Sequence, residues 1–433
     1  MQKSSRNIDR IVVTGDDPRA VANAGLILPA TLARRLGVEA LANESVDLAK
    51  RPGYFKPGRK IMTLVHSLIA GGSYIDDADV LRSASTEDVL GHRVMAPSTL
   101  GTFLRSFTFG NLRQLDRLCE QVLHRAWSAG AGPDDEPMII DIDSTICEVY
   151  GKQKQGAAYG YTKVLGLHPI AATRADTGEI LHVRMRKGSA GSARGAGFFA
   201  KETFERVRRC GATGLLTLRA DSAFFSHSVI DTCIENDVRF SITVDQNPAV
   251  VKLIGAIDEE SWVSIDYTEE GVAQVAETQY WGHRLVVRRT KVNDPKVLAL
   301  FPDWRHHAFI TDREGTAIEL DQDHRRHAVV ELVIRDVKDG AGLEHCPSGN
   351  FWANGAWLAI CVLAHNLMRW VAKIGAGNDD TIVVKTMRNR LFRTPGRMTK
   401  RGRGRILHLP ENWPWVDGFL EVLANLRAVR LIT

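Results

Sequence analysis

The sequence predicts an α/β protein, in which a mixed sheet core follows an all-helical region and is interrupted by a strand-rich insertion. Three observations predict this class. Apolar residues recur at helical spacing from residue 28 to residue 127. Short apolar, strand-like runs then alternate with helical segments from residue 138 to residue 244. Residues 245–320 carry mainly short strands with turn residues between them.

The first region, residues 1–133, is expected to be helical. The run from Leu112 to Trp127 places apolar residues on one face at roughly helical spacing. The helices within 84–125 fit either a DNA-binding helix-turn-helix or ordinary helical packing. The segment 128–136 is rich in Gly, Pro, Asp and Ala, which is typical of a linker at a domain boundary.

Residues 134–244 are predicted to form the first part of the sheet core. The run from Met138 to Asp143 is an apolar strand that ends in carboxylates, and two further strands follow before a helix over 198–210. A strand that ends at Asp221, a second short helix and a strand over 239–244 complete the region. The expected order is therefore strand, strand, strand, helix, strand, helix, strand.

After the strand-rich insertion (245–320), residues 321–375 are predicted to return to the core with two helices. The first covers His324 to Lys338 and the second covers Phe351 to Val371. The second helix is very apolar, but its uninterrupted apolar part is too short to cross a bilayer. We therefore expect a buried core helix and no membrane partner.

The charge of the chain is concentrated in its last part, 376–433, which is predicted to be a basic C-terminal region. The chain has 433 residues and a net charge of +5. Residues 341–433 hold 13 Lys and Arg but only six Asp and Glu, so they carry the whole positive excess. Such a block fits either contact with a polyanion or a solvated tail. The candidate DNA contacts in it are Arg397, Lys400, Arg401, Arg403 and Arg405.

The cysteines and the first residues indicate where the protein works. The six cysteines are scattered, and no CxxC pair is present that would indicate a zinc site. This pattern favours a reducing cytoplasm. The chain begins with a polar stretch, so we expect no signal peptide.

Three acidic residues are candidates for catalysis. Asp143 and Asp221 each close an apolar strand, and Glu331 lies on the helix that follows the insertion. Strand ends present side chains to a crevice, and carboxylates gathered there are the ligands that a hard divalent cation prefers. Taken singly, each acid also fits a turn residue or a helix cap.

The sequence resembles the DDE transposases of bacterial insertion sequences, in the branch whose ribonuclease-H-like core carries a strand-rich insertion. The closest group is the one named for insertion sequence 1380. The resemblance covers nearly the whole chain and rests on several short segments. They are Ile140 to Thr145, Tyr150 to Gln153, Tyr159 to Tyr161, Arg219 to Ser222, Glu331 to Lys338, Pro347 to Gly349, Asn354 to Trp357 and His365 to Leu367.

The resemblance implies an RNase H-like core in which Asp143, Asp221 and Glu331 form the DDE triad and hold two Mg²⁺ or Mn²⁺ ions. Asp141 lies two positions earlier on the same strand face and would position Asp143 without binding the metal ions itself. Glu331 and Lys338 keep the spacing of the family motif, and Lys338 would contact a DNA phosphate.

Two positions of that motif differ in this sequence. His324 stands where the family has Tyr, and His327 stands where it has Arg. The terminal phosphate would then be contacted by Arg326 or by a protonated His327.

The activity that the resemblance implies is cut-and-paste transposition. Metal ions would activate water and then a 3′ hydroxyl, with no covalent enzyme intermediate. The expected partners are double-stranded DNA with terminal inverted repeats, target DNA and a second copy of the chain in a synaptic homodimer. The family also suggests a hairpin on the element ends, and the expected location is the bacterial cytoplasm, at the nucleoid.

Two other functions remain open on the sequence alone. Asp141 to Thr145 also fits the DxDxT box of haloacid-dehalogenase-type phosphatases, with Asp379 and Asp380 as a downstream acidic pair. The succession of three early strands argues against their doubly wound sheet. The other alternative is a DNA-binding derivative without activity, for which the two histidines are the only sign.

Overall fold

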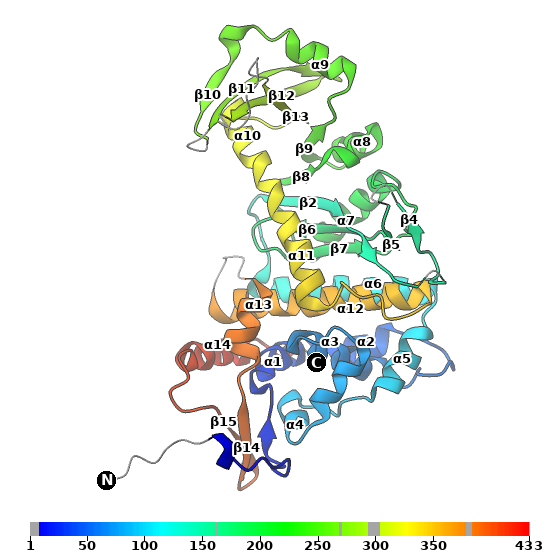
Figure 1. Ribbon diagram of the computed structural model, residues 1–433, viewed down its shortest axis with the longest axis vertical. Coiled ribbons are helices and arrows are strands. Elements are labelled where there is room, and N and C mark those ends of the chain that lie inside the picture. Colours follow the sequence, from blue (N-terminus) through cyan, green and yellow to red (C-terminus); the bar gives the residue numbers. More distant parts are fainter. Residues whose placement is uncertain are drawn as a thin grey trace.

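The computed structural model describes residues 8–151, 153–160, 163–267, 271–292, 304–377 and 383–432. Asp379 and Asp380 lie outside these ranges. The molecule is elongated, with the strand-rich insertion at one end, the sheet core in the middle and the helical region at the other end (Figure 1). Both α helices and a large mixed sheet are present, so the predicted α/β class is confirmed.

The core sheet is built from five strands in the order β7-β6-β2-β8-β9. They are β2 (Met138–Ser144), β6 (Ile170–Arg174), β7 (Ile180–Arg184), β8 (Leu216–Ala220) and β9 (Val238–Val244). β6 and β7 run antiparallel to β2, whereas β8 and β9 run parallel to it. The parallel strands are linked by α7 (Ala196–Cys210), which leads into β8, and α8 (His227–Glu235), which leads into β9. The predicted order of strands and helices, and with it the RNase H-like core, is confirmed.

The insertion extends this sheet. Its strands are β10 (Val263–Ile265), β11 (Gly271–Tyr280), β12 (His283–Val292) and β13 (Arg305–Thr311). β13 pairs with β9 in antiparallel register, with Ile310 opposite Ile242. The nine strands thus form one sheet in which the insertion continues the core beyond β9. The insertion also contains α9 (Pro248–Gly255) and a small hydrophobic cluster of its own around Val286 and Phe309.

A long helical segment connects the insertion to the core (Figure 1). It consists of α10 (Ala317–Arg325), a 3-10 turn (Arg326–Ala328) and α11 (Val329–Ala341). Thr316 and Glu319 form a capping box that fixes the start of α10. The predicted helix over His324 to Lys338 is therefore present, with a 3-10 turn just before Glu331.

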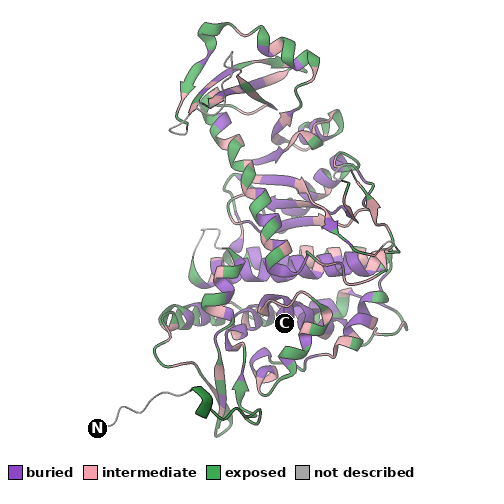
Figure 2. Cartoon of the chain, viewed as in Figure 1, coloured by how far each residue is buried: buried purple, intermediate pink, exposed green. Residues whose placement is uncertain are grey.

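Helix α12 (Phe351–Trp370) lies between the sheet and the helical region, and it is buried along almost its whole length (Figure 2). It is long and apolar enough to cross a membrane, but 94% of that stretch is buried inside the protein. The side chain of Asn366 accepts a hydrogen bond from the backbone N–H of Ile180 and donates one to its carbonyl. The helix is apolar all round because protein covers it on every side.

The helical region contains six α helices, several of which pack against α12. They are α1 (Ile27–Arg35), α2 (Val38–Ser45), α3 (Pro57–Ala70), α4 (Thr86–Leu90), α5 (Pro97–Arg105) and α6 (Phe109–Ala126). The end of the chain returns to this region, since α13 (Val384–Met387) packs against α11 and α14 (Val416–Ala428) packs against α1. Within the basic block, Arg388 is buried and donates to the backbone carbonyls of Leu68, Ile69 and Gly340.

Two small sheets were absent from the sequence prediction. β14 (Gly396–Arg401) and β15 (Gly404–His408) form a hairpin that pairs with β1 (Ala20–Val21). β3 (Cys147–Glu148), β4 (Ala158–Tyr159) and β5 (Leu165–Leu167) form a second sheet beside the end of β2. The strands of two or three residues are too short to leave a periodic pattern in the sequence.

Candidate active site

Asp143 and Asp221 lie at the carboxyl ends of two neighbouring parallel strands. Ile142 of β2 is opposite Ala220 of β8, and each aspartate is the next residue along. The parallel register therefore places the two acids side by side at one edge of the sheet. One oxygen of Asp143 accepts a hydrogen bond from the N–H of Ser144 (2.6 Å), and Asp221 caps a 3-10 turn through the N–H of Ala223 (3.0 Å).

The electrostatics of this edge favour a bound cation. The pKa of Asp143 is raised to about 6, mainly by burial and also by the negative charges of Asp221 and Glu331, although the hydrogen bond from Ser144 and the charge of His327 oppose the shift. Burial also raises the pKa of Asp221, and Asp245 and Glu331 add to the shift. Glu331 thus raises the pKa of both aspartates, and a cation at this edge would offset the cost of burying the carboxylates and the repulsion between them.

Glu331 approaches the two aspartates from α11. It lies in the first turn of that helix, which packs against β2, and its side chain is exposed. Over the ranges that the structure describes, no three His, Cys, Asp or Glu side chains are grouped closely enough to hold a metal ion. The structure thus brings Asp143 and Asp221 together and places Glu331 within electrostatic reach of both.

Asp245 is an acid of this edge that the sequence prediction missed. It directly follows β9, the third parallel strand, and it is exposed. Its charge raises the pKa of Asp221. The signal was available in the sequence, because Asp245 closes a strand just as Asp143 and Asp221 do.

Asp141 is held in a different way from Asp143, although both lie on β2. Its two oxygens accept hydrogen bonds from Nε and Nη2 of Arg219, each at 2.8 Å, and one of them also accepts from Nδ1 of His327 at 2.9 Å. Burial alone would raise the pKa of Asp141, but these hydrogen bonds lower it below its usual value. Asp141 is therefore a compensated carboxylate that ties β2 to β8 and to the turn before α11.

The two histidines that replace the family Tyr and Arg both have partners inside the protein. His324 stacks on Phe309, and its two ring nitrogens lie 2.7 Å and 2.9 Å from the hydroxyls of Ser241 and Thr243. Burial, with help from nearby positive charges, lowers the pKa of His324 to about 3, so it is neutral. His327 donates to Asp141.

The other candidate phosphate contacts of this region are arranged differently. Lys338 donates to the carbonyl of Ile146 at 3.1 Å, in the loop that follows β2. Arg326 is exposed on the 3-10 turn, and within the described ranges it has no ion-pair partner. Of the two phosphate contacts considered for the altered motif, Arg326 is therefore the one with a free side chain.

The glycine-rich loop after β7, residues 188–197, is held beside the catalytic edge. The hydroxyl of Ser144, which follows Asp143, lies 2.9 Å from that of Ser192 and 3.0 Å from Nε2 of His168. Arg186 donates to the carbonyls of Gly191 and Ser192. These contacts, which no sequence motif indicated, hold the loop beside Asp143.

The five candidate DNA contacts of the C-terminal region lie on the β14–β15 hairpin, at the end of the molecule opposite the insertion (Figure 1). Arg397 forms an ion pair with Asp17 (3.3 Å), and Arg405 forms one with Asp88 (2.7 Å). The tip carries three exposed cations that have no ion-pair partner in the described part of the chain. They are Lys400, Arg401 and Arg403.

The DxDxT reading of residues 141–145 does not fit this geometry. A phosphatase of that class needs the first Asp as a nucleophile that can reach the substrate. Asp141 is instead 1% exposed, and both its oxygens are used by Arg219 and His327.

Comparison with known proteins gives a matching family and similar solved structures. The model of the family described as transposase DDE domain group 1 matches residues 3–431. A solved structure of piggyBac transposase, in a synaptic complex with hairpin DNA, is similar with a TM-score of 0.47 and 12% sequence identity. The likeness covers 86% of this chain and 80% of that one. No curated protein sequence matches the chain.

Proposed function

The chain belongs to the family of transposase DDE domains, group 1, and on that premise we propose that it cuts DNA at the terminal inverted repeats of an insertion sequence and transfers the cut strand to target DNA. The single observation that carries this proposal is the pair Asp143 and Asp221 at adjacent strand ends, where burial and neighbouring carboxylates raise both pKa values. Such an edge suits metal-dependent phosphodiester chemistry better than any other class of reaction.

The donor set at this edge fits a hard divalent cation such as Mg²⁺ or Mn²⁺. Carboxylate oxygens are its preferred ligands, and Asp143, Asp221 and Glu331 would hold two such ions. Bound there, the ions would activate the attacking oxygen and stabilise the leaving oxygen of the phosphodiester. Because Glu331 is exposed at the start of α11, a short approach of that helix to β2 would complete the set.

The chain's own residues position this edge. Arg219, Asp141 and His327 connect two catalytic strands to the turn just before Glu331, so the three acids are held by one network. Lys338 fixes the loop that follows β2 through the carbonyl of Ile146. Arg326 projects from the same turn as His327, and we assign it the contact with a phosphate at the cut end.

The finer features of the reaction belong to the same proposal. We assign the chain to the group of insertion sequence 1380, working as a homodimer that synapses two ends at the bacterial nucleoid. The excision would be cut-and-paste, with a hairpin on the ends. The exposed tip of the basic hairpin, Lys400 to Arg403, would contact the DNA backbone away from the cleaved bond.

A cleavage assay on a labelled inverted-repeat duplex with Mg²⁺ tests the proposal. Asp143→Asn should abolish cleavage and leave duplex binding intact, whereas Asp231→Asn, an exposed acid on α8, should change neither. Retained cleavage by the Asp143 variant would refute the assignment of the active site. End binding without cleavage by the unmodified chain would favour the inactive derivative.

A further inference from the structure

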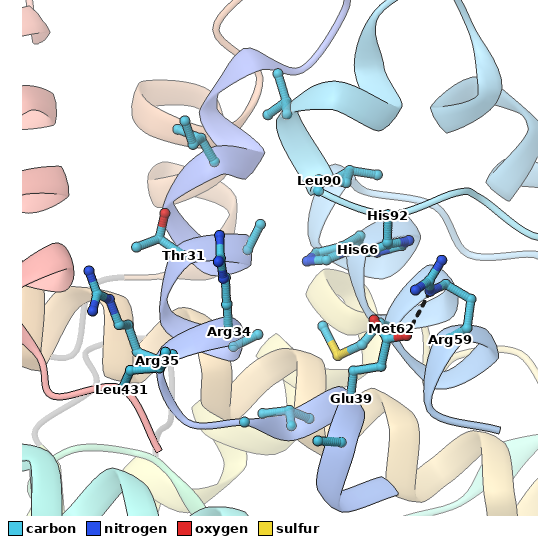
Figure 3. Close-up of a pocket in the computed structure, with 18 of the residues that line it drawn as sticks. Thr31, Arg34, Arg35, Glu39, Arg59, Met62, His66, Leu90, His92 and Leu431 are labelled. Atoms are coloured by element: carbon cyan, nitrogen blue, oxygen red, sulfur yellow. Dashed lines mark hydrogen bonds and ion pairs between the residues drawn. The ribbon is translucent and has the colours of Figure 1, made fainter. Parts of the chain in front are cut away.

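A large cavity lies in the helical region, separate from the catalytic edge. Its volume is about 910 Å³, and α1, α2, α3, α4 and the last residues of the chain line it (Figure 3). A cavity of this size holds a group as large as a nucleotide. Nothing in the proposed chemistry uses this cavity.

The cavity gathers positive charge. Arg34, Arg35, Arg59 and Arg427 line it, and only two acids, Glu39 and Asp88, do so as well. Both acids are already paired: Glu39 with Arg59 at 2.7 Å, and Asp88 with Arg405 of the basic hairpin at 2.7 Å.

Three of the cavity's guanidinium groups are therefore uncompensated. Arg34, Arg35 and Arg427 have no ion-pair partner within the ranges that the structure describes. Planar guanidinium groups present paired donors that match phosphate oxygens.

A buried polar atom faces the same space. His66 is 1% exposed, and its Nε2 has no hydrogen-bond partner among the described residues. Its other nitrogen, Nδ1, lies 3.0 Å from Nε2 of His92. Figure 3 shows Arg34 and His66 on opposite sides of the cavity, with the Glu39–Arg59 pair beside them. This nitrogen is therefore free to take a hydrogen-bond partner from the cavity.

The hydrogen bonds of the histidine pair define the state of that nitrogen. Nδ1 of His92 donates to the carbonyl of Arg93 (3.1 Å), so in a neutral pair its Nε2 accepts from Nδ1 of His66. Nε2 of His66 then carries no proton. It can donate to an acceptor in the cavity only after it takes one up.

We propose that this cavity binds a phosphate group of a DNA strand, held by Arg34, Arg35 and Arg427, and that His66 takes up a proton when the phosphate enters. That the phosphate belongs to DNA rests on the proposed function, whereas the binding of a phosphate rests on the arginines and His66 alone. The adjoining hairpin supports this source, since the Asp88–Arg405 pair joins the cavity to the cationic tip. A strand that follows the hairpin would continue into the cavity.

The charged groups around His66 determine how this proton is taken up. A phosphate oxygen beside Nε2 would supply both a negative charge and a hydrogen-bond acceptor, and each of these favours the protonated form of His66. Burial and the neighbouring His92 keep the pKa of His66 well below its usual value in the free protein. The charged groups that line the cavity or act on the histidine pair are Arg34, Arg35, Glu39, Arg59, Glu87, Asp88 and Arg427.

Binding of duplex and single-stranded DNA by the full chain, without divalent metal, tests the cavity apart from cleavage. Arg34→Gln should weaken duplex binding on the order of five- to tenfold and lower the salt slope by about 1. Arg105→Gln, an exposed arginine of α5 outside the cavity, is the matched control and should have neither effect. Equal affinity and equal slope in Arg34→Gln and the unmodified chain would overturn the proposal.

A second arm tests the proton and the source of the phosphate. An oligothymidylate, whose phosphodiesters do not titrate near neutrality, should bind more tightly at pH 6 than at pH 8, and His66→Gln should abolish this difference. A pH dependence that survives His66→Gln would refute the role of His66. If Arg34→Gln weakens the binding of inorganic phosphate but leaves the affinity for DNA unchanged, the cavity binds free phosphate and the assignment to DNA is wrong.

Because this arm and the duplex assay need no metal and no cleavage, they distinguish failure of the cavity from failure of the proposed catalysis. If the unmodified chain cuts the duplex and Arg34→Gln binds the duplex with unchanged affinity, the cavity proposal is wrong and the proposed catalysis stands.

Discussion

The catalytic edge and the arginine-lined cavity both hold several charges of one sign, negative at the edge and positive in the cavity. At the edge, Asp143 and Asp221 are partly buried at strand ends, and burial together with neighbouring carboxylates raises their pKa values. In the cavity, Arg34 and its neighbours stand on helices around open space, where water screens them. Both places keep charge that the folded chain does not neutralise. Each place therefore suits a ligand of opposite sign, a cation at the edge and a phosphate in the cavity.

Asp141 shows what a compensated acid looks like on the same strand. Two residues from Asp143, it has Arg219 and His327 as partners, and its pKa is lowered. The difference between the two aspartates therefore comes from their partners and not from their strand. Substitutions at the two kinds of site should therefore have different effects on cleavage, stability and binding.

The largest effect is expected from removing one charge of the edge. Asp221→Asn should reduce cleavage about a thousandfold, which corresponds to roughly 4 kcal/mol of transition-state stabilisation. The same change should raise the stability of the metal-free protein by about 0.5–1 kcal/mol, because it removes repulsion with Asp143. Cleavage rates and urea unfolding measure the two effects. A loss of stability in the metal-free variant would contradict the idea that this edge is uncompensated.

The compensated acid should behave in the opposite way. Arg219→Met leaves Asp141 buried with only His327 as a partner, and it should lower the free energy of unfolding by about 3 kcal/mol. Chemical denaturation provides the measurement. Arg239→Met, which removes a half-exposed arginine paired with Asp312, is the matched control and should change stability by less than about 1 kcal/mol. Equal losses of unfolding free energy in the two variants would show that Arg219 does not compensate Asp141, and the contrast between Asp141 and Asp143 would not hold.

The acidity of Asp143 predicts a pH dependence of metal binding. Its pKa of about 6 means that the carboxyl is mostly protonated below that pH and ionised above it. A cation must displace this proton, so Mg²⁺ affinity should fall up to about tenfold per unit as pH drops below about 6. Calorimetric titration between pH 5 and pH 7 measures it. Asp143→Asn should lose this dependence, and an unchanged affinity across the range would contradict the shifted pKa.

The smallest effect is expected at the basic hairpin. Neutralising Lys400, Arg401 and Arg403 together should weaken duplex binding and lower its salt slope by up to about 3, since up to three phosphate contacts are lost. Neutralising Arg397 and Arg405 should have a smaller effect, because each already pairs with an acid. Equal salt slopes in the two variants would show that pairing does not decide which cations meet DNA.

Much of the candidate site could be predicted because its acids mark the ends of local elements. Asp143 and Asp221 close apolar strands, and Glu331 follows a capping box by twelve residues on a continuous helical segment. Asp245 escaped notice although it obeys the same rule. The partners of Asp141 could not be predicted, because His327 is 186 residues away in the chain and carries no local sign of its contact.

The elements and their order follow from local features of the sequence, since periodicity, strand-ending acids and helix caps act within a few residues. Ser226 caps α8 and Asn350 caps α12 through their own side chains, without help from distant parts of the chain. Tertiary structure alone decided which charges are compensated. Asp141 meets Arg219 across two strands, and Arg34 meets Arg427 around a cavity closed by the last helix. The physical reason is that a charge is set by its neighbours in space, and folding chooses those neighbours from the whole chain.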